Sequence, residues 1–187
     1  TILFILSSIQ FAYSQIPDDT NGRLYRLCKV WGYFKYFSVH NCDPMQWDTL
    51  LNTTINEVIA ANSNTDFNLA LMNMFNKVGN NYPLYTQQAY PDSNLNFQTA
   101  WLNDSLFDNS VQLFLDTFSN YVYPISSNCF IKYNNYTNAN YTSMIDFRKD
   151  SLKMPINYSV ESHRLTMMFY YWNVINYFHA EIGRAHV

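Results

Sequence analysis

The sequence predicts a mainly α-helical protein in which a helical hairpin or three-helix unit is used twice, with a loop- and strand-containing insert between the copies. Apolar residues recur at helical spacing in several segments, and a chain of 187 residues that is 48% hydrophobic can bury a core. An aromatic segment also occurs twice: RLYRLCKVWGYFKYF begins at Arg23 and RLTMMFYYWNVINYF begins at Arg164. Arg, Leu, Trp, Tyr and Phe coincide in the two segments without a gap.

The N-terminal residues 1–14 are expected to be an N-terminally incomplete signal peptide. An apolar run from Ile2 to Ala12 ends in Ala12-Tyr13-Ser14, the small-residue arrangement after which signal peptidase cuts. The run is shorter than the roughly 20 apolar residues of a spanning helix, so no stable membrane anchor is expected. The alternative is a buried strand or helix. Export to the periplasm or the extracellular space, with a mature chain beginning at Gln15, is the favoured interpretation.

The first helical unit is expected to span residues 15–80, and its first helix contains the first aromatic segment. A helical wheel of this segment has an apolar face and, opposite it, a more polar face, which predicts an amphipathic helix. The apolar face holds Leu24, Leu27, Cys28, Trp31 and Phe34, and the opposite face holds Arg26, Lys29, Tyr33 and Tyr36.

Two more helices are expected in this unit. Asp43 and Pro44 provide an N-cap and a first-turn proline, followed by apolar residues at helical spacing. These residues are Trp47, Leu51, Ile55, Val58 and Ile59. After a polar break, a third apolar stripe ends at Gly79, a typical helix-terminating residue. It contains Phe67, Ala70, Leu71, Met74, Phe75 and Val78.

Residues 81–158 are expected to form the insert. The segment 80–103 contains Pro83 and Pro91 and predicts a long ordered loop. A helix is expected over residues 110–119, where Val111, Phe114, Leu115 and Phe118 share one face. The following segment, NCFIKYNNYTNANYTSMIDF at 128–147, is typical of strand and turn.

The start of the second unit is expected at residues 159–180. Its helix would begin near Ser159 or Ser162 and is apolar nearly all round, which predicts that both of its sides are buried. The face predicted to point inward holds Leu165, Met168, Phe169, Trp172 and Ile175. The other face holds Met167, Tyr170, Val174 and Tyr177.

The aromatic pattern stops at the ending EIGRAHV. Residues 181–187 match a translated read-through of a common sequencing adapter, so they are excluded from fold reasoning. We therefore expect the chain to be a fragment whose second unit is cut off after one helix. A natural polar tail is the alternative.

Composition excludes several classes of function. The net charge is −3, only 13% of residues are charged, and no run of Lys or Arg could follow a phosphate backbone, so nucleic acid is not an expected partner. The only four glycines, at 22, 32, 79 and 183, leave no glycine-rich loop for a nucleotide. No cofactor is expected.

We nominate no catalytic, cofactor-binding or metal-ligating residue from the sequence. Ser151 and Lys153 are too common a pairing to indicate a dyad, and the group His40, Cys42 and Asp43 lacks a second pair of zinc ligands. His163 is interpreted as a first-turn helix residue. The carboxylates have no paired spacing that would indicate a glycosidase; they include Asp66, Asp104, Asp116 and Asp146.

Three cysteines leave at least one unpaired in any disulfide scheme. Cys28 is expected to act as a small core residue. The disulfide state of Cys28, Cys42 and Cys129 stays open.

Several blocks together resemble a known family. In order, RLCKVWGYFKYF, WDTLLNTTINEVIAA, WLNDSLF at 101–107 and RLTMMFYYWNVINYF are similar to the N-terminal helical region of secreted, Bacteroidetes-type serine peptidases of the carboxyl-terminal processing, or tail-specific, family. The similarity runs over roughly Arg23 to Phe178. It implies a peptidase domain beyond these residues, with a serine nucleophile, a lysine general base and often a PDZ module. The implied partners are that domain and a protein or peptide substrate.

Two functional hypotheses follow. The favoured one is a non-catalytic N-terminal helical region of an exported serine endopeptidase. The alternative is a secreted carbohydrate- or peptide-binding helical module without enzymatic activity. Its exposed aromatic residues would be Tyr25, Tyr33, Tyr36, Tyr136 and Tyr141.

Overall fold

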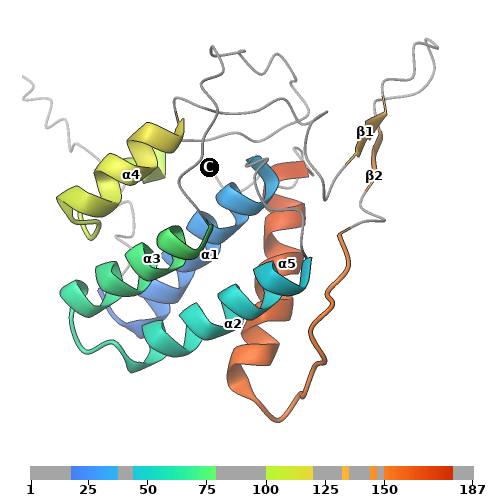
Figure 1. Ribbon diagram of the computed structural model, residues 1–187, viewed down its shortest axis with the longest axis horizontal. Coiled ribbons are helices and arrows are strands. Elements are labelled where there is room, and N and C mark those ends of the chain that lie inside the picture. The colour runs from blue at the N-terminus through green and yellow to red at the C-terminus, as the bar shows by residue number, and fades with distance from the viewer. Residues whose placement is uncertain are drawn as a thin grey trace, which may run out of the picture.

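The computed structural model describes residues 18–37, 44–78, 100–119, 132–134, 144–146 and 150–178. The fold is mainly α-helical, as the sequence predicts (Figure 1). In chain order the elements are α1 (Thr20–Phe37), α2 (Pro44–Ala60), α3 (Asn64–Val78), the 3-10 helix η1 (Ala100–Asn103), α4 (Asn109–Ser119), β1 (Lys132–Asn134), β2 (Met144–Asp146) and α5 (Glu161–Phe178). The predicted signal peptide at 1–14, residues 80–99 of the predicted loop 80–103, and residues 181–187 lie outside the described residues. The end of that predicted loop, Ala100–Asn103, is not loop but forms η1.

Local capping sets where several helices begin. Asp19 accepts a hydrogen bond from the Gly22 amide at 2.8 Å and so caps α1. Pro44 is the first residue of α2, where a missing N–H costs nothing. At α3, the Ser63 hydroxyl accepts from the Asp66 amide at 3.1 Å and donates to the Asp66 carboxylate at 2.8 Å. These caps hold the helices in the segments where periodicity predicts them.

The predicted helix over 110–119 is α4, and the strand-and-turn segment contains β1 and β2. Asp108 caps α4 by accepting from the amides of Ser110 and Val111, both at 2.9 Å. The two strands pair antiparallel, with Tyr133 opposite Ile145.

The prediction of an amphipathic first helix is wrong, because α1 is buried nearly all round. On its predicted polar face, Arg26, Tyr33 and Tyr36 are buried, and only Lys29 is half-buried. Other elements cover both sides of the helix. Tyr33 packs on Trp101 of η1 with ring centroids 5.7 Å apart, and Tyr36 packs on a ring of α5. The helix is therefore the central element of the core.

Among the described residues α5 is buried on one side only, and the predicted choice of its inward face is wrong. Met168, which was expected to point inward, is 54% exposed, and Tyr171 is 71% exposed. The buried stripe is instead Ser162, Thr166, Phe169, Asn173 and Tyr177. Small and polar residues in this stripe, such as Ser162, Thr166 and Asn173, let α5 lie close to its neighbours, and Tyr171 on the other side points outward.

The two aromatic segments pack against each other at equivalent positions. Gly32 of α1 and Asn173 of α5 align in the repeat, and an added Cβ at Gly32 would lie only 1.9 Å from the Asn173 side-chain oxygen. Asn173 donates to the carbonyl of Cys28 at 3.0 Å and to that of Phe169 at 2.9 Å. Figure 1 shows the C-terminal ends of α1 and α5 side by side. Since α5 also packs on α2, it shares one core with the first three helices.

Candidate functional site

A cluster of charged and phenolic side chains, buried except for the half-buried Tyr170, joins α1, α2, α5 and the segment before α5. Lys35 of α1 forms a salt bridge with Asp150, and neither side chain is exposed by more than 2%. Tyr36 donates its hydroxyl to the other oxygen of Asp150 at 2.6 Å. The Lys35 ammonium also lies 3.4 Å from the ring centroid of Tyr170, a cation–π geometry. We call Lys35, Tyr36, Asp48, Asp150 and Tyr170 the buried ionic cluster.

Asp48 of α2 is the second carboxylate of this cluster and is fully buried. One of its oxygens accepts a hydrogen bond from the Tyr170 hydroxyl. The other accepts from the backbone amides of Lys153 and Met154 at 2.6 and 3.1 Å. Asp48 therefore attaches the segment leading into α5 to α2, and its charge is satisfied by hydrogen bonds.

Burial dominates the electrostatics of the cluster. It lowers the pKa of Lys35 to about 8 from an ordinary value of 10.5, although Asp150 and Asp48 act in the opposite direction. Burial also raises the pKa of Tyr36 and Tyr170, and the neighbouring carboxylates add to both shifts. The tyrosines therefore stay protonated and act as donors to the two aspartates.

The position of the cluster between helices indicates a structural role. A lysine with a lowered pKa can serve as a base or nucleophile where substrate reaches it. Here Lys35 is fully buried, and the three cavities of about 470, 260 and 220 Å³ found among the described residues are lined by other side chains. Within the described part of the chain, the cluster therefore acts to hold α1, α2 and α5 together.

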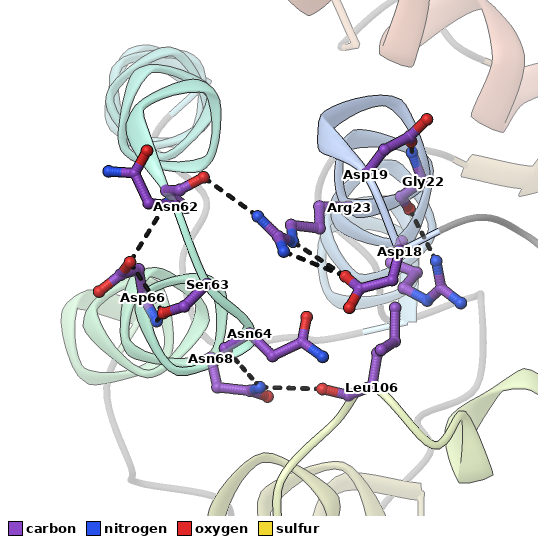
Figure 2. A network of polar contacts seen from close by, with 12 residues as sticks. Asp18, Asp19, Gly22, Arg23, Asn62, Ser63, Asn64, Asp66, Asn68 and Leu106 are labelled. Atoms are coloured by element: carbon purple, nitrogen blue, oxygen red, sulfur yellow. Dashed lines mark hydrogen bonds and ion pairs between the residues drawn. The ribbon is translucent and has the colours of Figure 1, made fainter.

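A second polar network lies at the N-terminal end of α1 (Figure 2). Arg23 forms a salt bridge with Asp18 at 3.1 Å and donates to the carbonyl of Ala61, in the turn between α2 and α3, at 3.0 Å. Arg26 forms a salt bridge with Asp104 at 2.8 Å. These arginines connect α1 to the α2–α3 turn and to the segment that follows η1.

Asn68 of α3 joins the same region to the start of α4. Its side-chain nitrogen donates to the carbonyls of Asn64 and Leu106, and its oxygen accepts from the Asp108 amide at 3.0 Å. Figure 2 shows the side-chain amide of Asn68 between α3 and Leu106. The hydrogen bonds of Asn68 therefore connect α3 to the segment before α4.

The residues considered above as catalytic or metal-binding candidates have structural positions where the structure describes them. His163 lies in the first turn of α5, and its Nδ1 accepts from the Asn157 amide at 3.0 Å. Lys153 is exposed and contributes its backbone amide to Asp48, not its side chain to Ser151. His40, Cys42 and Asp43 lie outside the described residues. Within the described ranges, no group of three or more His, Cys, Asp or Glu side chains could hold a metal ion.

The candidate carboxylates have separate structural positions. Asp66 belongs to the α3 cap, Asp104 pairs with Arg26, Asp116 is exposed on α4, and Asp146 is in β2. Cys28 is a free, buried cysteine of the core, where burial raises the pKa of its thiol. Cys129 lies outside the described residues, as do Tyr136 and Tyr141.

Two of the aromatic residues assigned to a binding face are not on the surface. Tyr33 and Tyr36 are at most 1% exposed, whereas Tyr25 is half-buried and packs edge-on against Trp172. The expectation that Tyr33 and Tyr36 are exposed is wrong, because the helix that carries them is central.

Sequence reasoning missed the buried ionic cluster. Asp150 is far from Lys35 and Asp48 in the chain, and Tyr170 is one of 16 tyrosines. The only signal in the sequence is a lysine within a run of aromatic residues, whose burial would require an anionic partner. No spacing rule identifies that partner.

Comparisons with protein-family models, with curated proteins and with solved structures find no match to this chain. Among the described residues, none of the helices has the length and apolar character needed to span a membrane.

Alkaline pH is expected to unfold the protein cooperatively. Burial raises the pKa of Tyr33, Tyr36, Tyr170 and Tyr177 above the ordinary 10.0, so their stabilisation is complete below pH 10.0 and is lost as pH rises through the folded-state values. Each unit of pKa difference corresponds to about 1.4 kcal/mol. Because the pKa of Lys35 is lowered in the folded state, its titration raises the free energy of unfolding as pH increases from about 8 to 10.5. The net loss of stability therefore begins above pH 10.0.

The measurement is the free energy of unfolding in urea as a function of pH, with phenolate absorbance recorded in parallel. We expect the phenolate signal of the buried tyrosines to appear together with unfolding. Complete titration of all tyrosines near pH 10.0 in a folded protein would contradict their burial.

Proposed function

We propose that this chain is the non-catalytic N-terminal helical region of an exported serine endopeptidase of the tail-specific family, and that it packs against or orients the catalytic domain. Peptide-bond hydrolysis would then use a serine and a lysine outside residues 1–187. The chain itself would contribute a rigid helical support.

The observation that carries this proposal is the pairing of the two aromatic segments at Gly32 and Asn173. Both segments belong to the blocks that resemble the peptidase family, and both act as packing elements of one core. An aromatic stripe at helical spacing that fills a core has a structural role and is not a ligand site. This favours a supporting region over an independent binding module.

The side chains of the described residues support the same conclusion. An acyl-transfer site needs a nucleophile, a base within hydrogen-bond reach and donors for an oxyanion. The lysine with the most perturbed environment, Lys35, is enclosed by the two aspartates of the buried ionic cluster and by Tyr36 and Tyr170. Its side chain is fully buried among the described residues.

The proposal predicts that the chain alone does not react with a serine-directed acylating probe. The longer product of the same gene should react, at a serine beyond residue 187. The measurement is probe labelling of both proteins, followed by peptide mapping, with heat-denatured samples as controls. Labelling of the chain that disappears on Ser151→Ala would contradict the proposal, and so would an in-frame stop soon after Phe178 in the gene.

A further inference from the structure

The repeat assigns every residue of α1 a counterpart in α5, and the two helices differ in how they are covered. Arg26 aligns with Met167, Leu27 with Met168, and Val30 with Tyr171. The three α1 residues are at most 5% exposed. Their α5 counterparts are 37%, 54% and 71% exposed. We call Met167, Met168 and Tyr171 the α5 docking face.

On α1, the same helical face contacts the segment after η1 through Arg26, and it contacts α3 and α4 through Phe34, whose α5 counterpart Ile175 is half-buried. Arg26 pairs with Asp104 after η1 at 2.8 Å. Two turns further along, Phe34 packs on Phe75 of α3 and Phe114 of α4, with ring centroids 5.0 and 5.5 Å apart. Phe75 and Phe114 stack on each other at 4.1 Å. The cover is therefore a pair of helices that meet through aromatic rings.

The α5 docking face is continuous with the packing interface between α1 and α5. Met168 lines a cavity of about 220 Å³ between these helices, together with Tyr25, Cys28, Phe169 and Trp172. The opposite side of α5 is already occupied by α1 and α2 through Asn173 and Tyr170. Contiguous exposed apolar surface of this kind is uncommon on soluble monomers and indicates an interaction site.

We propose that the α5 docking face receives a pair of amphipathic helices equivalent to α3 and α4, supplied by a second helical unit in the longer gene product. This inference rests on the proposed function for the existence of that longer product. The occupant is chosen because α1, the other copy of the same helix, contacts such a pair through Phe34 on the same helical face.

Charge distinguishes the two docking surfaces. The α1 face contains Arg26 and needs the carboxylate of Asp104. The α5 face has Met167 at that position, and α5 has no charged residue after Arg164. The second pair of helices should therefore be apolar and aromatic where it meets α5, without a counterpart of Asp104.

The first test measures binding of a hydrophobic fluorescent dye to the chain of residues 1–187. The double variant Met168→Ser/Tyr171→Ser should lose roughly half of the dye fluorescence, because it removes two of the three exposed apolar side chains of the α5 docking face. The matched control is Leu69→Ser/Leu113→Ser, which removes two exposed leucines of α3 and α4 and should retain the signal. Equal signals from both double variants would overturn the inference.

The second test identifies the occupant in the longer gene product, with a photoreactive benzophenone amino acid at position 171. A cross-link to a helical segment after Phe178 supports the inference. Cross-links to another copy of the chain, to residues 1–17 or 79–99, or to a folded peptidase domain would overturn it. Labelling of the same longer product with the serine-directed probe tests the proposed function separately. A product that cross-links to a helical segment after Phe178 but does not react with the probe would overturn the proposed function and leave the docking inference standing.

Discussion

Replacing Lys35 with methionine is expected to lower the free energy of unfolding by about 3–5 kcal/mol, because it leaves a buried carboxylate without its cation. Asp150 is 2% exposed at its side chain and would keep the hydrogen bond from the Tyr36 hydroxyl, and Asp48 lies in the same buried ionic cluster. Such a loss is a large part of the roughly 5–15 kcal/mol that stabilises a typical domain. Urea unfolding followed by circular dichroism measures it.

A matched control and a rescue variant separate charge from packing. Lys77→Met removes an exposed lysine in the last turn of α3 and should change stability by less than about 0.5 kcal/mol. The double variant Lys35→Met/Asp150→Asn removes both charges while an amide oxygen can still accept from Tyr36. It should be more stable than Lys35→Met alone, with a coupling of about 1–3 kcal/mol. A Lys35→Met protein as stable as Lys77→Met would show that the cluster is not closed to water.

Replacing Gly32 with asparagine is expected to destabilise the protein by about 3 kcal/mol, the upper range for overpacking a close-packed core. Even a Cβ at this position would lie 1.9 Å from the Asn173 oxygen. The Asn173 side chain cannot move away cheaply, because it donates to the carbonyls of Cys28 and Phe169. Thermal and urea unfolding of Gly32→Asn measure the effect.

The repeat suggests a sharper experiment, the exchange of the two residues. In Gly32→Asn/Asn173→Gly the helix crossing again contains one glycine and one asparagine. The double variant should recover at least about 1 kcal/mol relative to the sum of the two single variants. Asn173→Gly alone should lose about 1 kcal/mol from helix propensity and more from its hydrogen bonds. Additive effects of the two substitutions would mean that these positions do not pack against each other.

The sequence by itself determined the mainly α-helical fold and the segments in which its α-helices lie. Periodicity and capping residues are local signals, so Pro44, the Ser63–Asp66 pair and the apolar stripe of residues 111–115 are sufficient to locate α2, α3 and α4. The aromatic repeat was likewise readable from the alignment of Arg23 with Arg164.

Only the tertiary structure decided which helix is central and which side chains meet. The wheel of α1 looks amphipathic, yet Arg26 and Tyr33 are buried because Asp104 and Trp101, far away in the chain, cover them. The wheel of α5 looks apolar all round, yet Tyr171 is exposed because Asn173 determines the side that packs.

The buried ionic cluster shows the physical reason for this division. Its hydrogen bonds join residues that are more than a hundred positions apart, such as Tyr36 with Asp150 and Asp48 with Tyr170. Periodicity reports how one helix divides its own surface, but not which neighbour compensates a buried charge. That compensation depends on how three helices approach one another, and the close approach at Gly32 brings Lys35 and Tyr36 of α1 into the cluster.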